Sequence, residues 1–213
     1  MVSKAETEAT EKLKLQLVKD KTKLGELVPE VKQVKQYAPK RLDLACGQHK
    51  QKGYKGIDIA GDADIVHDLF KVPWPIKSGV VEAVFCSHFL EHIPHDIGIG
   101  KDGFFAFMDE VYRILKPGGI ARFMHPYVWN DRAFWDPTHV RFIHEANYNY
   151  LNKEWRTSQG LDHYDVDCDF EIVTISFGYF TDELRLKPEA YQDWARTHLK
   201  NAIGDLDVVL RKN

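Results

Sequence analysis

The chain contains few cysteines and no long apolar segment. Its 213 residues include Cys46, Cys86 and Cys168, none of which forms a CxxC pair. So sparse and odd a set argues against a disulfide framework and is typical of a reducing cytosol. No run of about 18 apolar residues could form a membrane-spanning helix, and the N-terminal MVSKAETEATEKLKLQ lacks the apolar centre of a signal peptide. We therefore expect a cytoplasmic protein with no membrane partner.

The sequence also lacks an excess of charge of one sign. Lysine and arginine number 29 against 32 aspartate and glutamate residues, which gives a formal net charge of −3. This balance argues against a broad nucleic-acid-binding surface, so we expect no nucleic-acid partner. Hydrophobic residues make up 44% of the chain, enough for a globular core. A chain of this length holds one core, or one core and an arm.

Two segments differ in texture. Residues 1–38 are rich in charge, and their apolar residues follow a helical spacing that Gly25 and Pro29 interrupt. We therefore expect an N-terminal helical arm over 1–38, followed by one domain over 39–213. The arm is a candidate for pairing with a second copy of the chain. Its apolar positions are Leu13, Leu17, Leu24, Leu27, Val28, Val31 and Val34.

The domain predicted for residues 39–213 alternates short apolar runs with helical patterns. The helical patterns lie at 102–115 and 187–202, and VVEAVFCSHFLEHI at 80–93 is expected to be a strand that runs into a helix. LKPGG at 115–119 is expected to be a helix stop and a turn. Strands that alternate with helices predict a mostly parallel sheet covered by helices. The apolar runs expected to form strands are 41–46, 55–59, 64–66, 81–86, 119–124, 170–177 and 205–210.

The stretch RLDLACGQHKQKGYKGIDI, residues 41–59, suggests a nucleoside site. Small residues, Ala45 and Gly47, follow the first strand, where a ligand approaches the backbone of an open sheet. Asp58 ends the next strand, where a carboxylate accepts hydrogen bonds from both ribose hydroxyls. The dinucleotide fingerprint GxGxxG is absent, and the segment from Gly47 to Asp58 is too short for the helix that binds a pyrophosphate. A nucleoside without a phosphate therefore fits better, and a tight turn between strands is the alternative.

Five strings in order resemble a known family. They are LDLACG…GYKGIDI, DIVHDL, CSHFLEHI, RILKPGG and DPTHVRFI. They are similar to motifs of the class I S-adenosylmethionine-dependent methyltransferases over about residues 41–145, and the closing LDVVLRK suits the last strand of that fold. Ala45 stands where glycine is common in the family, and Glu82 stands where aspartate is usual.

The resemblance implies a fold and a cofactor. The fold is α/β, a Rossmann-like, seven-stranded, mostly parallel sheet with an antiparallel last strand and helices on both faces. The cofactor is S-adenosyl-L-methionine. By family order, the methionine end would lie against the first strand end, the ribose and adenine against the next two, and the sulfonium against the fourth. The cofactor-binding residues implied in that order are Asp43, Ala45 and Gly47, then Asp58 and Ile59, then Asp68 and Leu69, then Ser87 and His88. Asp68 has an alternative role as the cap of a turn.

The loop over residues 125–142, HPYVWNDRAFWDPTHVRF, follows the predicted fifth strand and would hang over the pocket. Its aromatic residues would exclude water, and its ionisable residues would orient or deprotonate a nucleophile. The candidate general bases are His139, His88 and His125, in that order, because imidazole titrates near neutral pH. The alternative is an ordered loop held by its own hydrogen bonds.

We expect transfer of a methyl group to a small-molecule or glycan-like acceptor, with no metal. Two other functions stay open. One is a catalytically silent module that binds the cofactor. The other is a zinc hydrolase, because HFLEH at 88–92 has the H-x-x-E-H spacing of inverted zinc proteases. Glu91 and His92 would otherwise make local hydrogen bonds. An amino-methyltransferase of nucleic acids is disfavoured, because no Asn/Asp-Pro-Pro-Tyr stretch follows the fourth strand.

Overall fold

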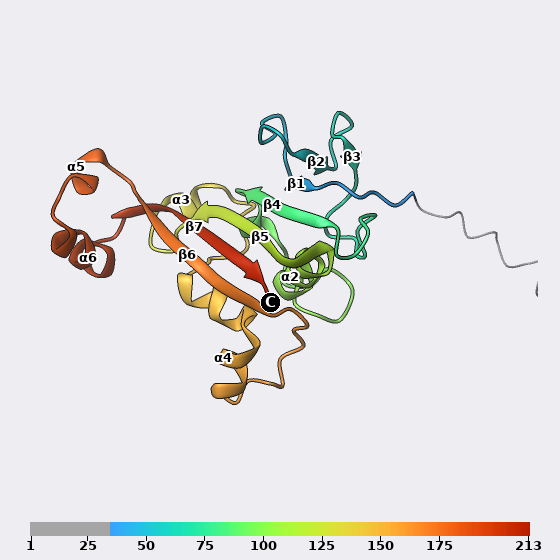
Figure 1. Cartoon of the computed structure of the whole chain (residues 1–213). Helices are drawn as coiled ribbons and strands as arrows, with labels where there is room; N and C mark the ends of the chain where they lie inside the picture. Colours follow the sequence, from blue (N-terminus) through green and yellow to red (C-terminus); the bar gives the residue numbers. More distant parts are fainter. Residues whose placement is uncertain (1–34) are drawn as a thin grey trace, which may run out of the picture. The chain divides into compact units, whose positions relative to one another are not determined.

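The computed structural model describes residues 35–213, and the elements described below belong to the unit of residues 36–213 (Figure 1). The arm predicted for residues 1–38 lies outside the described residues up to position 34, so this division of the chain stays a prediction. Tyr37 is attached to the unit by its backbone. Its N–H donates to the carbonyl of Pro75 at 2.8 Å, and its own carbonyl accepts from Lys77 N at 2.9 Å.

The unit is built on a seven-stranded sheet with the order β3-β2-β1-β4-β5-β7-β6. Neighbours from β3 to β5 pair in parallel, whereas β7 pairs antiparallel with both β5 and β6. This confirms the predicted mostly parallel sheet with an antiparallel last strand. The strands are β1 (Arg41–Leu44), β2 (Lys55–Asp58), β3 (Ile65–Val66), β4 (Val81–Ser87), β5 (Leu115–Pro126), β6 (Phe170–Tyr179) and β7 (Ile203–Lys212).

The longest described helix, α2 (Gly103–Ile114), follows directly from its sequence. Asp102 is its N-cap, and the Asp102 carboxylate accepts a hydrogen bond from Phe104 N at 2.9 Å. Phe104, Phe107, Met108 and Val111 recur at the helical period and are buried. The predicted turn at 115–119 is instead the start of β5. Leu115 already pairs with Val81, the ladder resumes at Ile120 with Ala83, and the residues between them bulge out.

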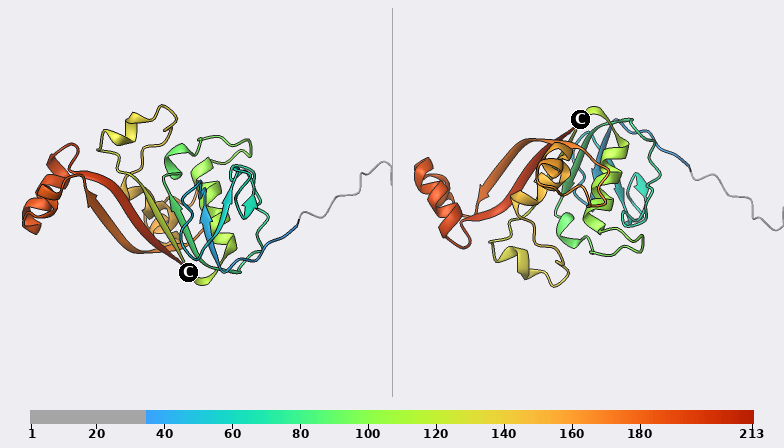
Figure 2. Two further views of the ribbon diagram at one scale, coloured as in Figure 1. Left: turned by 90° about the horizontal axis from the view of Figure 1, so that it is seen from above. Right: turned by 90° about the horizontal axis from the view of Figure 1, so that it is seen from below.

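The other helical segments are short. The prediction of a helix after the fourth strand is wrong. Only the 3-10 turn η1 (Leu90–His92) forms there, before Pro94 and the glycines that follow. Among the described residues, no helix has the length and apolar character needed to cross a membrane. The remaining segments are α3 (Arg132–Trp135), η2 (Glu145–Leu151), α4 (Lys153–Ser158), α5 (Asp182–Arg185) and α6 (Glu189–His198). Figure 2 shows α5 and α6 at the end of the long β6–β7 ladder.

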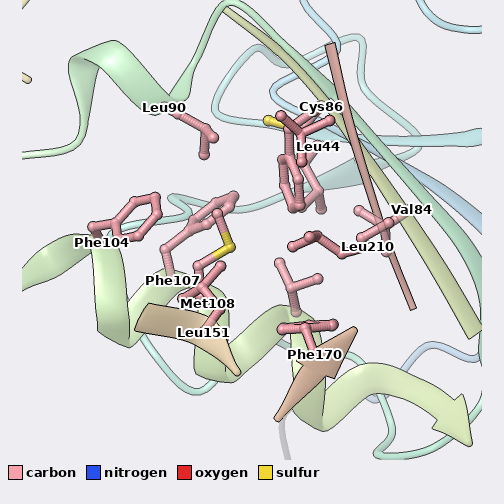
Figure 3. Packing of buried hydrophobic residues seen from close by; sticks show 14 of the residues in the cluster. Leu44, Val84, Cys86, Leu90, Phe104, Phe107, Met108, Leu151, Phe170 and Leu210 are labelled. Atoms are coloured by element: carbon pink, nitrogen blue, oxygen red, sulfur yellow. The ribbon is translucent and has the colours of Figure 1, made fainter. Parts of the chain in front are cut away.

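The core lies between one face of the sheet and α2 with η2 (Figure 3). Leu44 of β1 and Cys86 of β4 are fully buried, as are Met108 of α2 and Leu151 of η2. Burial of each such side chain stabilises the fold by about 1.5–3 kcal/mol. All three cysteines are buried free thiols.

The opposite face of the sheet carries side chains that are partly or fully accessible, among them Phe85, Arg122 and Val209. The connections β1–β2 and β2–β3 are too short to place a helix over this face. Helices were expected on both faces of the sheet. Among the described residues, they cover one face more than the other.

Candidate active site

The carboxyl ends of β1 and β4 lie side by side, because these strands pair in parallel with Leu44 opposite Cys86. The residue after each strand end has a left-handed backbone. Ala45 has φ 53°, and His88, one residue after Ser87, has φ 51°. Such conformations are strained for residues other than glycine and concentrate at functional sites. At position 45 the family pattern has glycine, which adopts this backbone without strain.

Asp58, at the end of β2, lies against the turn that follows β1. Its Oδ2 accepts a hydrogen bond from Gly47 N at 2.9 Å, and its Oδ1 accepts one from Ala60 N at 3.0 Å. The predicted glycine and the predicted ribose-binding carboxylate are thus brought together. Each carboxylate oxygen has a further lone pair for a ribose hydroxyl.

Asp43 lies beneath this turn and is buried, with 2% of its surface exposed. Its Oδ2 accepts a hydrogen bond from Gln51 N at 2.6 Å. Burial raises the pKa of Asp43, and the hydrogen bond from Gln51 partly offsets this effect. Asp43 therefore fixes the 46–51 loop from below. Gly56 of β2 allows this packing, because a Cβ there would collide with Cys46 Sγ.

A cavity of about 360 Å³ opens at the ends of β1, β2 and β3. It contains five of the predicted cofactor-binding residues. Sequence reasoning missed two aromatic walls, Phe70 and Phe89, whose rings stack with centroids 5.5 Å apart. Both follow motif residues, Leu69 and His88, which was the signal that could have indicated them. The lining residues are Ala45, Asp58, Ile59, His67, Asp68, Leu69, Phe70 and Phe89.

Asp68 is placed at the cavity and within a turn. It lines the cavity, and its Oδ1 accepts a hydrogen bond from Phe70 N at 3.0 Å, which makes it the cap of a turn. This turn sets the position of the Phe70 ring. The predicted residues Asp43, Gly47, Ser87 and His88 do not line the cavity. Ser87 and His88 lie at the neighbouring end of β4.

His88 is the most accessible of the three candidate bases, since 40% of its side chain is exposed. Its Nδ1 lies 3.3 Å from Glu91 Oε1. The Glu91 carboxylate raises the pKa of His88, while partial burial opposes this shift. Burial raises the pKa of Glu91, but His88, His125 and the local backbone together outweigh burial, so the pKa of Glu91 falls below its ordinary value.

The other two candidate bases face inward. His125 is fully buried, with Nδ1 3.0 Å from Pro126 O and Nε2 2.9 Å from the Tyr148 hydroxyl. Burial lowers the pKa of His125. His139 has 9% of its side chain exposed, and its Nδ1 lies 3.0 Å from Ala133 O. The structure therefore brings only His88 to the accessible edge of the sheet.

A second cavity, of about 780 Å³, lies beside the end of β5. Its walls come from the loop after β5, from the start of η2, and from the end of α6 with the two residues that follow it. Because β7 runs antiparallel, its start lies at the same sheet edge as the carboxyl ends of β1 and β4. The lining residues are Tyr127, Val128, Trp129, Phe134, His144, Glu145, Arg196, Thr197, His198, Leu199 and Lys200.

The loop after β5 is ordered by its own hydrogen bonds, as the alternative interpretation expected. The buried Asn130 donates to Ile203 O at 2.7 Å and accepts from Arg132 N at 2.9 Å. Arg132 in turn pairs with Asp205 of β7 at 3.0 Å. These contacts fix the loop to the start of β7, and Trp129 remains 60% exposed.

The two cavities have a fixed relation in the sheet. The first opens at β1, β2 and β3, and the second at β5 and β7, with the end of β4 between them. Sequence reasoning anticipated the aromatic residues of the second cavity but missed its wall of residues 196–200. In the sequence, that wall has the pattern of an ordinary solvent-exposed helix end.

Proteins of known structure have a fold similar to that of this chain. The fold is similar to a S-adenosylmethionine-dependent methyltransferase from Archaeoglobus fulgidus, with 17% identity, coverage of 92% of this chain and 94% of that chain, and a TM-score of 0.55. A S-adenosylmethionine-dependent methyltransferase from Mesorhizobium loti is 16% identical, with coverage of 90% and 96% and a TM-score of 0.44.

No curated protein matches the chain. Residues 35–123 match the family model described as a methyltransferase domain. This segment contains β1 to β4, η1, α2 and most of β5, and with them every residue of the first cavity. Residues 35–123 therefore carry a methyltransferase domain, and the fold is similar to that of a S-adenosylmethionine-dependent methyltransferase, which implies S-adenosylmethionine as the cofactor.

Proposed function

We propose that the enzyme transfers the methyl group to a small-molecule or glycan-like acceptor by in-line displacement. The observation that carries this proposal is the pair of cavities on opposite sides of the end of β4. When bound, S-adenosylmethionine supplies an electrophilic methyl group. The protein has to hold the acceptor on the far side of that group, and orientation with exclusion of water lowers the barrier by roughly 7–11 kcal/mol in the best cases.

The first cavity fits the nucleoside part of the cofactor. The Asp58 carboxylate is a hydrogen-bond acceptor for ribose hydroxyls, and the rings of Phe70 and Phe89 offer apolar walls for a flat base. Asp68 is placed to accept a hydrogen bond from an exocyclic amine. Asp43 and Gly47 would act by shaping the turn that borders the methionine end.

The second cavity fits a sugar-like acceptor. Tyr127, Trp129 and Phe134 provide aromatic faces, on which the apolar face of a sugar ring stacks. His144 and Arg196 provide hydrogen-bonding groups for hydroxyls. A cavity of about 780 Å³ suits a small ring better than a folded macromolecule. The proposal therefore retains the prediction that the acceptor is not a nucleic acid.

His88 lies at the end of β4 and is the histidine placed between the two cavities. Its side chain is 40% exposed, so a ring nitrogen of His88 is accessible to accept a hydrogen bond from the nucleophile of the acceptor. We therefore prefer His88 to His139 and His125 as the residue that orients the nucleophile.

Methyl-labelled cofactor tests the acceptor class. The protein is incubated with labelled S-adenosylmethionine and with monosaccharides, nucleotide sugars, RNA, DNA or protein. Label is expected in a sugar-like small molecule, and label that appears only in a macromolecule would contradict the proposal. Trp129→Ala should raise KM for the acceptor at least tenfold and change kcat little. Trp135→Ala is the matched control, because Trp135 is also exposed (68%) in this loop but lines neither cavity.

A further inference from the structure

A cluster outside both cavities combines one carboxylate and two imidazoles. Glu91 and His92 belong to the turn η1, and His139 comes from the loop after α3. One ligand atom from each residue lies within 4.8 Å of the other two. We propose that Glu91, His92 and His139 bind one divalent transition-metal ion. The proposal does not rest on the acceptor proposed above.

Glu91 is the observation that points to a cation. The residue is 3% exposed, and no described group donates a hydrogen bond to either of its carboxylate oxygens. His88 Nδ1, at 3.3 Å, and His139 Nε2, at 4.0 Å, approach Oε1 without hydrogen-bond geometry. A buried carboxylate normally has donors or coordinates a metal, because its desolvation is costly. A cation at this position would compensate Glu91.

Both histidines hold their rings in the tautomer that a metal requires. The carbonyl of Ala133 is 3.0 Å from His139 Nδ1, so this nitrogen carries the proton and Nε2 has a free lone pair. Thr138 Oγ1 donates to Asp136 Oδ1 at 2.7 Å, so it accepts from His92 Nδ1 at 3.0 Å. The lone pair of His92 is therefore also on Nε2. Metal-binding histidines are typically oriented by such hydrogen bonds from the other nitrogen.

The geometry selects the class of metal. Two imidazoles and one carboxylate favour Zn²⁺, Fe²⁺, Co²⁺ or Ni²⁺ over Mg²⁺ and Ca²⁺, which prefer oxygen ligands. Ligand atoms about 2.0–2.2 Å from one ion are at most about 4.4 Å apart. The observed spread of up to 4.8 Å is wider than this, so the three side chains have to rotate toward one another to bind one ion.

This ligand set differs from the one that the H-x-x-E-H motif suggests. In that motif a helix places two histidines on one face at positions i and i+4. Here the residues after His88 form a 3-10 turn of three residues, so His88 and His92 do not share a helical face. His139 takes the place of His88, and its ring meets that of His92 edge to face with centroids 4.7 Å apart.

Metal titration of the untagged full-length protein tests the proposal. After treatment with a chelator, Zn²⁺ and Co²⁺ are titrated calorimetrically, and Co²⁺ also by absorbance. We expect one ion per chain, with affinity reduced about 100-fold by His92→Ala and by His139→Ala. Thr138→Val should reduce affinity about tenfold, as expected for a residue that orients a ligand. His163→Ala should have no effect, because His163 is exposed and remote in sequence from the cluster.

Zinc-edge X-ray absorption of the unmodified protein keeps the test valid if a variant fails to fold. Scattering from two imidazoles and one carboxylate would support the proposal, and a shell without imidazole would overturn it. No uptake at millimolar metal would also overturn it. So would affinity lost in His88→Ala and retained in His139→Ala, because the ion would then belong to the H-x-x-E-H pair.

Discussion

At the scale of single residues, the site depends on a few positions where backbone and side chain are constrained together. Ala45 and His88 are left-handed at adjacent strand ends, and Asp58 connects the β1 turn to the β2 end. The sequence indicated Ala45 and Asp58 because small residues and an acid at strand ends are typical of a nucleoside-binding site. Phe70 and Phe89 have a weaker signal, their position directly after the motif residues Leu69 and His88, because an aromatic residue at such a position is equally typical of a core.

Ala45→Val tests the constraint at the end of β1. A β-branched residue at φ 53° is strained, so the free energy of unfolding should fall by about 1–2 kcal/mol. Its extra methyl groups enter the first cavity, so affinity for S-adenosylhomocysteine should fall at least tenfold. Denaturant unfolding and calorimetry measure the two effects. Ala45→Gly is the control and should retain both stability and affinity, and equal behaviour of the two variants would contradict the assignment.

A substitution of Asp64 tests which hydrogen bonds stabilise the turn after β1. Its carboxylate accepts hydrogen bonds from Lys50 Nζ at 2.7 Å, Gly56 N at 2.8 Å and Lys55 Nζ at 2.9 Å. Because the lysines are exposed, Asp64→Asn should lower the free energy of unfolding at pH 7 by only about 1 kcal/mol.

The effect of Asp64→Asn should depend on pH in a defined direction. The hydrogen bonds from Lys50, Gly56 and Lys55 lower the pKa of Asp64 below its unfolded value of about 3.9. Its stabilisation is therefore complete above about pH 4 and is lost as the pH falls through the folded-state pKa. Urea unfolding at pH 7 and pH 3 should show a smaller difference between wild type and variant at pH 3. A larger difference at pH 3 would contradict this account.

At the scale of elements, the strands were predictable and the turns between them were not. Every predicted apolar run contains an observed strand or at least half of one, because alternation and chain breakers are local signals. The helix expected after β4 failed because Pro94, Gly98 and Gly100 outweigh the helical spacing of the residues before them. That failure also explains why the cluster of Glu91, His92 and His139 could not be derived from the HFLEH motif.

Gly103→Ala tests the start of α2. A Cβ at Gly103 would collide with the carbonyl oxygen of Pro94, which belongs to the segment that follows η1. The backbone would have to shift, so the free energy of unfolding should fall by about 1–3 kcal/mol in thermal or denaturant unfolding. Gly61→Ala is the matched control, because a Cβ there meets nothing within 4 Å. Equal stability of both variants would show that the close approach does not constrain the fold.

At the scale of the whole unit, residues 36–213, strand order decides which cavities can serve one reaction. The motif order predicted that β1 and β4 are neighbours, and therefore predicted the cofactor side. The acceptor side could not be predicted, because its second wall reaches the site only through the antiparallel pairing of β7 with β5. Residues 196–200 carry no local signal of that contact.

The central claim is that the adenosine part of the cofactor binds at the ends of β1 and β2 through Asp58. Calorimetric titration of S-adenosylhomocysteine into wild type, Asp58→Ala and Asp62→Ala tests it most directly. Asp62 is an exposed acid in the same segment and serves as the control. Loss of two charge-assisted hydrogen bonds should weaken binding roughly 30- to 100-fold in Asp58→Ala, with Asp62→Ala like wild type. Undiminished binding by folded Asp58→Ala, or no binding by wild type, would contradict the account.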